Sequence, residues 1–241
     1  MNEIRSTEMP DAKPAATGSA GKAIIRLFSL ILVLEGIFYL TSRKIDWVMG
    51  WVLIGAYLFC LAINVLVLLR TNPGLLAERM QSKFHYRSWD KKVASILGIF
   101  WAIGFILPGL DYRFGWSPEM GLTPRIIALL VMMLGNFIFL WAMSVNKFFT
   151  RMICIQKDSG HTTVTTGPYR YVRHPGYVGW KLMNIAPVVM LGSFWALIPT
   201  VLAIFMMIIR TALEDRTLHN ELDGYGEYAA RVGYRLLPGI W

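Results

Sequence analysis

Long apolar segments occupy most of this chain and limit the folds open to it. A helix rises about 1.5 Å per residue, so about 20 apolar residues cross a bilayer. Inside the bilayer the backbone must satisfy its own hydrogen bonds, which favours helices. The apolar segments lie at about residues 23–41, 47–69, 93–110, 125–145 and 178–209. The last is too long for one helix, and the stretch 191–194 (Leu-Gly-Ser-Phe) offers a turn within it. We therefore expect an all-α integral membrane protein with about six transmembrane helices, ending in a helical hairpin.

The composition agrees with this fold class. Hydrophobic residues make up 55% of the 241 residues and charged residues 16%, whereas soluble domains carry about 25% charged residues. The net charge of +9 could suggest nucleic-acid binding. However, the basic residues lie in short segments beside apolar spans, where membrane topology and anionic headgroups explain them. We expect no nucleic-acid partner. The two cysteines form no CxxC motif, and no HExxH motif is present, so no metal site is expected.

The distribution of Lys and Arg predicts the topology. These residues gather before residue 23, between 70 and 92, between 147 and 173, and after 209, while the intervening loops carry few of them. The positive-inside rule then places both termini in the cytoplasm. We expect a bacterial inner membrane or an equivalent membrane that faces the cytoplasm. Residues 1–22 are predicted to be a disordered cytoplasmic tail, 23–124 the N-terminal transmembrane helices and 125–241 a functional core.

A basic, aromatic and turn-rich segment, residues 167–180, interrupts the apolar pattern. Its three tyrosines, two prolines and basic side chains are poor material for a transmembrane helix. Pro175 fixes its own φ and pushes His174 away from helical geometry. The segment is therefore typical of a ligand site at the membrane surface.

A second polar group follows the last apolar segment. Arg210 and Glu214 are one helical turn apart and could form a simple intrahelical salt bridge. The predicted topology puts this group on the same side of the membrane as the loop of residues 146–180. The two groups could therefore meet over one cavity.

These residues resemble the isoprenylcysteine carboxyl methyltransferases and related integral-membrane methyltransferases. The matching pattern is Arg173-His174-Pro175-x-Tyr177-x-Gly179, followed after a helical hairpin by Glu214-Asp215. The resemblance covers about residues 125–241, and the earlier segments match only as hydrophobic helices. Asp215 departs from the family, which often has a second Glu there.

The resemblance implies an S-adenosylmethionine-dependent methyltransferase with a cytoplasm-facing cofactor pocket in the C-terminal half. Carried over by position, the cofactor-binding residues would be Gln156, His161, Thr162, Thr163, Val164, Tyr169, His174, Pro175, Gly176, Tyr177 and Glu214. Arg210 would face the methyl acceptor as the substrate-binding and catalytic residue. Arg173 is a second catalytic candidate, or braces the loop.

The resemblance favours carboxyl O-methylation of an isoprenylcysteine-like, lipophilic acceptor that arrives from the bilayer. A guanidinium such as that of Arg210 suits an anionic acceptor, because it can hold a carboxylate through two parallel hydrogen bonds. A phospholipid N-methyltransferase is the alternative enzyme. A non-catalytic transporter or sensor, and a membrane reductase on a related scaffold, also remain open.

Overall fold

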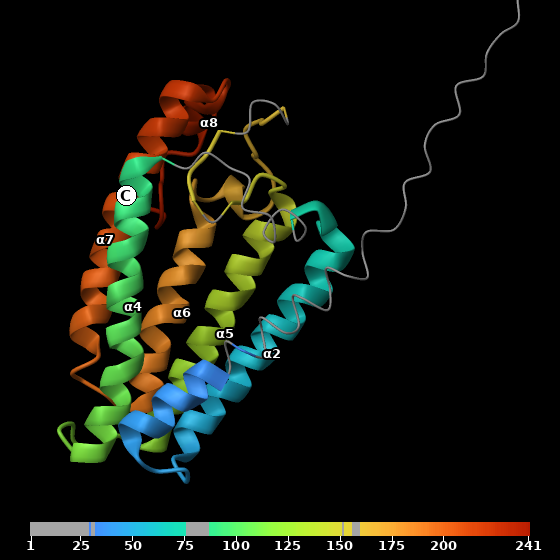
Figure 1. The fold of residues 1–241 in the computed structure, drawn as a ribbon. Coiled ribbons are helices and arrows are strands. Elements are labelled where there is room, and N and C mark those ends of the chain that lie inside the picture. Colours follow the sequence, from blue (N-terminus) through green and yellow to red (C-terminus); the bar gives the residue numbers. More distant parts are fainter. Residues whose placement is uncertain (1–28, 30–31, 76–86, 151, 156–159) are drawn as a thin grey trace, which may run out of the picture.

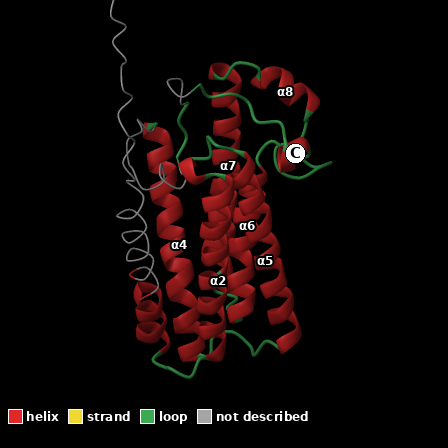
Figure 2. Cartoon of the chain, turned by 90° about the vertical axis from the view of Figure 1, so that its right-hand side faces the viewer, coloured by secondary structure: helices red, strands yellow, loops and turns green. Residues whose placement is uncertain are grey.

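The protein is a bundle of long helices, with shorter elements and loops forming a cap at one end (Figures 1 and 2). A computed structural model describes residues 29, 32–75, 87–150, 152–155 and 160–241. These residues contain helices and no strand. The main helices are α2 (Val48–Thr71), α4 (Ser88–Phe114), α5 (Leu122–Val145), α6 (Pro175–Leu191) and α7 (Leu197–Glu221); the short elements are the 3-10 helix η2 (Gly167–Arg170) and α8 (Tyr225–Arg231).

The all-helical prediction is confirmed for the described residues. Four helices are long and apolar enough to cross a membrane: α2, α4, α5 and α7. Helix α6 has 17 residues and the apolar helix Leu32–Ser42 is also short, so the count of six spans stays a prediction. The predicted tail, residues 1–22, lies outside the described residues.

Two glycines bring α5 and α6 into close contact. A Cβ atom at Gly179 would lie 2.5 Å from the carbonyl oxygen of Gly135 and 2.7 Å from the backbone nitrogen of Phe139. Small residues at such a crossing let helix backbones approach closely. Asn64 of α2 donates a hydrogen bond to Asn136 of α5 at 3.0 Å, which is an interhelical polar contact of the kind expected in membranes.

The predicted helical hairpin is present. Helix α6 ends at Leu191, and Gly192 follows in the left-handed conformation with φ 75°. Helix α7 begins at Leu197. The hydroxyl of Ser193 donates to the carboxylate of Asp111, at the C-terminal end of α4. This contact fixes the turn of the hairpin to the neighbouring helix.

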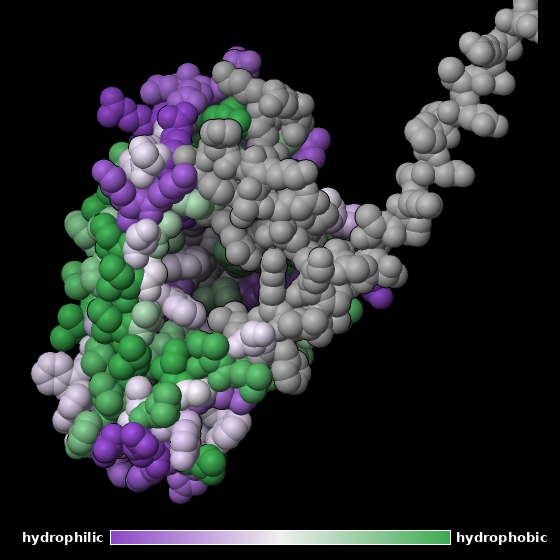
Figure 3. All heavy atoms as spheres, in the orientation of Figure 1, coloured by the Kyte–Doolittle hydropathy of each residue, from purple (hydrophilic) through white to green (hydrophobic). Residues whose placement is uncertain are grey.

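The opposite end of the bundle carries the polar cap. There the start of α6, the end of α7, α8 and the segment between α5 and α6 come together (Figure 1). Hydrophilic residues gather at this end and also at the opposite end of the molecule, whereas the flank of the bundle between them is hydrophobic (Figure 3). The cap therefore brings together the two polar groups that the sequence separates.

Candidate functional site

The polar cap encloses a cavity of about 110 Å³. Its walls come from the segment after α5, from η2, from the first turn of α6, from the polar part of α7 and from α8. Ten of the residues predicted for the site line it: His161, Thr162, Thr163, Val164, Tyr169, Arg173, His174, Gly176, Tyr177 and Glu214. The structure thus brings the segment 161–177 and Glu214 to one cavity.

Three predicted site residues lie elsewhere. Gln156 is outside the described residues. Pro175 is fully buried as the first residue of α6 and does not line the cavity. Arg210 is also buried and lies behind the wall, with its guanidinium 5.5 Å from the ring centre of Tyr177.

The sequence does not mark the other wall residues as part of a site. These residues are mostly apolar or aromatic. The added wall residues are Asn146, Phe148, Phe149, Thr150, Met152, Ile153, Cys154, Leu218, Leu222, Tyr225 and Tyr228. An apolar wall residue cannot be told from a packing residue before the fold is known.

The C-terminal tail holds the Arg-His-Pro motif in place. The backbone N–H of Arg173 donates to the carbonyl of Tyr234, and that of His174 to the carbonyl of Arg235, both at 2.9 Å. His174 is the N-cap of α6 and lies outside helical geometry, with φ −126° and ψ 60°, because Pro175 disfavours the α conformation for the residue before it. The tail therefore satisfies backbone donors that the helix start leaves unpaired.

Asp215 is the centre of a buried polar cluster between the motif, α8 and the tail. Its carboxylate accepts hydrogen bonds from Arg173 at 3.1 Å, Tyr225 at 2.7 Å and Arg235 at 2.8 Å, and lies 3.2 Å from His174. Asp215 itself does not line the cavity. Its observed contacts link three segments of the cap, so this side chain has a structural use.

Glu214, the neighbour of Asp215 in α7, does line the cavity. It accepts a hydrogen bond from the hydroxyl of Tyr177, and both side chains belong to the wall. Because these residues come from α6 and α7, their bond joins the two helices of the hairpin beside the cavity. The carboxylate of Glu214 is thereby held in one orientation.

Arg210 reaches across to α4 and pairs with a buried carboxylate. Its Nε and Nη2 atoms donate to Asp90 at 2.6 and 3.0 Å. Asp90 is fully buried and also accepts a bond from the backbone N–H of Ile153 at 2.7 Å. Asp90 thus connects α4, α7 and the cavity wall. The sequence does not single out Asp90, because one Asp in the first turn of a helix is common.

Comparison with known proteins identifies the part of the chain that carries this cavity. Residues 126–220 match the model of the isoprenylcysteine carboxyl methyltransferase (ICMT) family. This segment is similar to that family. The resemblance expected from the sequence is confirmed, and the ICMT segment contains Arg173, His174, Arg210 and Glu214. The tail that holds the motif lies beyond it.

Curated relatives carry the name protein-S-isoprenylcysteine O-methyltransferase. The chain is 29% identical to the Xenopus laevis protein over 120 residues, which is 48% of this chain and 42% of that protein. The chain is 31% identical to the human protein over 101 residues, which is 38% of this chain and 34% of that protein. An Arabidopsis thaliana relative, the B form, is 27% identical over 128 residues, or 52% and 61%. The similarity spans less than two thirds of each relative.

The cavity is lined mainly by neutral aromatic and apolar groups, by the carboxylate of Glu214, and by Arg173 and His174, which are engaged with Asp215 behind the wall. Burial raises the pKa of Tyr169 and Tyr228, and burial together with Asp215 raises that of Tyr225, so these phenols stay protonated. Burial lowers the pKa of His161, whose ring stacks on Phe148 at 4.3 Å between centres. Aromatic faces beside a carboxylate attract cations. The wall therefore suits a ligand with an apolar body and a positively charged group.

Proposed function

We propose that this chain is a membrane-embedded methyltransferase. It would use S-adenosylmethionine to methylate the carboxylate of a lipophilic, isoprenylcysteine-like acceptor. The observation that carries the proposal is the cavity where the segment 161–177 meets Glu214, within the segment that matches the ICMT family. The names of the relatives support the same acceptor class.

The cavity fits the chemistry of the cofactor. S-adenosylmethionine has a positive sulfur, an ammonium group, a carboxylate and an adenine. Glu214, with the rings of Tyr177 and Phe149, would hold its positive groups. Gly176 leaves room beside this wall, because a Cβ atom there would lie 2.6 Å from the Phe149 ring. The apolar part of the wall would cover the adenine.

The bound cofactor supplies an electrophilic methyl group on a sulfonium sulfur. An acceptor carboxylate is already ionised at neutral pH, so this reaction needs no general base from the protein. The residues of the chain would instead orient the reactants and exclude water. The Tyr177–Glu214 bond keeps one charged group of the wall fixed during the reaction.

Arg210 remains our candidate for binding the acceptor. Two of its nitrogens are bonded to Asp90, and its guanidinium lies over the ring of Tyr177, which lines the cavity. An acceptor carboxylate would therefore meet a guanidinium whose orientation is already fixed by its pair with Asp90. Arg173 is assigned to bracing, since its Nη1 and Nη2 donate to the carbonyls of Ala229 and Val232 and to Asp215.

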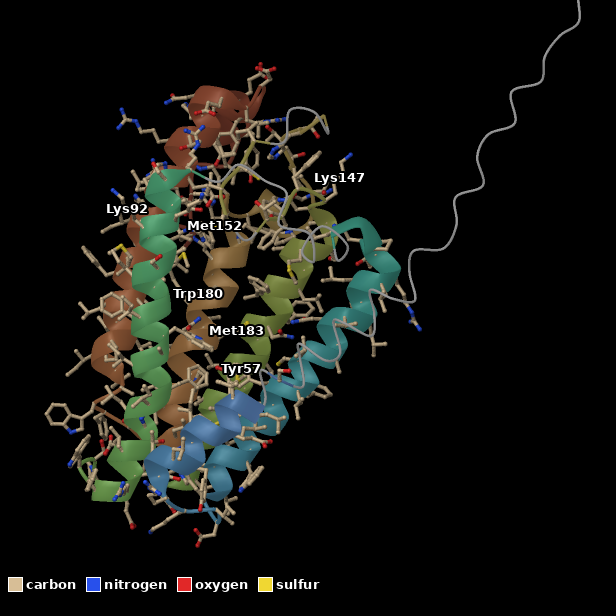
Figure 4. The ribbon with its side chains drawn as sticks, viewed as in Figure 1. Tyr57, Lys92, Lys147, Met152, Trp180 and Met183 are labelled. Atoms are coloured by element: carbon tan, nitrogen blue, oxygen red, sulfur yellow. The ribbon has the colours of Figure 1, made fainter. Side chains whose placement is uncertain are left out.

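The acceptor would arrive from the bilayer, and the cofactor from the cytoplasm, where the positive-inside rule places the cap and both termini. Helix α4 packs mainly on α7, while α2 packs on α5. The surface is hollowed between them in Figure 3. In the same view Figure 4 places Tyr57 of α2 with Trp180 and Met183 of α6 at this hollow. Such a hollow offers an apolar side entrance below the cap.

Calorimetric binding of S-adenosylmethionine and of its demethylated product to detergent-purified protein tests the proposal. We expect saturable binding that Glu214→Ala abolishes. Glu227→Ala is the matched control, because Glu227 is an exposed acid of α8 outside the cavity, and it should bind as the unchanged protein does. Arg210→Ala should keep cofactor binding and lose turnover of a prenylcysteine acceptor. An equal loss of cofactor affinity in Arg210→Ala and Glu214→Ala would contradict the assigned roles.

The same assay separates the alternatives. Turnover of an amine-bearing phospholipid in place of prenylcysteine would indicate an N-methyltransferase. Cofactor binding with no turnover on any lipid acceptor would favour a transporter or sensor. Binding of a reduced nicotinamide cofactor, with none of the sulfonium one, would favour a reductase.

A further inference from the structure

A second hollow lies on the other side of the Asp215 cluster, between α7 and α8. We call it the α7–α8 groove, and its volume is about 620 Å³. Small residues of α8 form one wall, one stripe of α7 forms the other, and two arginines close one end. The groove is lined by Ala212, Asp215, Arg216, His219 and Asn220 of α7, by Gly226, Ala229 and Ala230 of α8, and by Arg173 and Arg235.

The charge of the α7–α8 groove is positive. Three guanidinium groups face one carboxylate, that of Asp215, which already accepts bonds from Arg173 and Arg235. Arg235 uses its Nε atom for this bond, and its side chain is 34% exposed. Arg216 is exposed, and the described part of the chain offers it no partner. Guanidinium donors therefore remain available in the groove.

The position of the groove along α7 suits the headgroup level of the membrane. Helix α7 is apolar up to Ile209, and Arg216 lies about 10 Å further along at about 1.5 Å per residue. The adjoining tail exposes apolar side chains, with Tyr234 43% exposed, Leu237 48% and Ile240 77%. Aromatic and apolar side chains beside basic ones are typical of the headgroup region.

We propose that the α7–α8 groove binds a phosphate group. Arg216 and the terminal nitrogens of Arg235 would form its donors, because a guanidinium holds two phosphate oxygens through parallel hydrogen bonds. Gly226 and Ala230 leave space for the phosphate to approach α8. The source is either the headgroup of an anionic phospholipid or a soluble phosphate compound. The groove shares only Arg173 with the lining of the methyltransferase cavity, and the phosphate site does not depend on the proposed reaction.

The test uses the full chain and two probes. Inorganic phosphate is titrated into protein in an uncharged detergent, and spin-labelled phosphatidylglycerol is measured on protein in phosphatidylcholine nanodiscs. Arg216→Gln is compared with Arg231→Gln, which removes the same charge from an exposed residue of α8 outside the groove. Loss of a bidentate contact should weaken binding about tenfold or more in Arg216→Gln and leave Arg231→Gln unchanged.

Each outcome decides the inference. If Arg216→Gln weakens only the binding of phosphatidylglycerol, and Arg231→Gln does not, the site binds a lipid headgroup. If Arg216→Gln also weakens the binding of inorganic phosphate, the site accepts a soluble phosphate compound as well. No binding of either probe, or an equal effect of the two substitutions, would overturn the proposal. An unchanged circular-dichroism spectrum and an unchanged thermal unfolding midpoint of Arg216→Gln show that the variant is folded.

Discussion

Replacing Asp90 by asparagine should cost the folded protein about 3–5 kcal/mol, the usual cost of breaking a buried ion pair. The carboxylate is fully buried and accepts three hydrogen bonds, two from Arg210 and one from the N–H of Ile153. Asparagine keeps one acceptor oxygen, and its amide nitrogen must face a donor. Charge-assisted hydrogen bonds contribute about 1.5–3 kcal/mol each, so one or two lost bonds, with Arg210 left buried, give this range.

The same helix pair provides a control. Arg87, at the start of α4, forms an ion pair with Glu221, at the end of α7, and the two side chains are 37% and 36% exposed. An exposed pair contributes less than about 1 kcal/mol, so Glu221→Gln should change stability little. Denaturant unfolding in detergent, followed by tryptophan fluorescence, gives both free energies. Equal costs for Asp90→Asn and Glu221→Gln would refute the claim that burial makes the Asp90 pair important.

Further expectations concern the cavity, its pH response and the helix packing. Tyr177→Phe should weaken S-adenosylmethionine binding about threefold to tenfold in calorimetry, because it removes the hydroxyl that holds Glu214; unchanged affinity would contradict the proposed orienting role. Because burial lowers the pKa of His161, its stabilising contribution is complete above its unfolded pKa of about 6.5 and is lost as pH falls through the lower folded value. The midpoint temperature of thermal unfolding, measured from about pH 8 to about pH 5, should therefore fall less in His161→Phe than in the unchanged protein. Parallel curves of midpoint against pH would count against this. Gly179→Ala should destabilise by about 1–3 kcal/mol, because its Cβ meets the backbone of α5, whereas Gly55→Ala in α2 has open space and should be neutral or stabilising; denaturant unfolding compares them.

The sequence predicted the helices well where apolar length decides the outcome. The expected segments 47–69 and 125–145 match α2 and α5 to within a few residues. The hairpin turn lies at Gly192, as its conformational freedom suggested. Helix α4 extends beyond the expected segment 93–110 to Ser88–Phe114, because charged first and last turns can continue a helix into the polar region.

The sequence marks candidate site residues by chemical motifs, and the roles assigned to them stay predictions. His174, Tyr177 and Glu214 line one cavity, as the shared topology of the loop and tail suggested. The second acid, Asp215, lies instead in the cluster with Arg173 and Arg235. Helix periodicity places neighbouring acids on different faces, but it does not say what each face meets.

The sequence by itself determined the membrane class, the positions of the main helices and the chemical character of the two polar groups. These properties depend on local apolar length, proline geometry and charge, all of which can be read along the chain. Only the tertiary structure decided which distant residues the polar side chains and the motif backbone bind. Arg210 pairs with Asp90, 120 positions away, and the tail holds the backbone of Arg173 and His174. The chemical character of a side chain is fixed by the sequence, whereas its partner depends on which distant helix packs beside it.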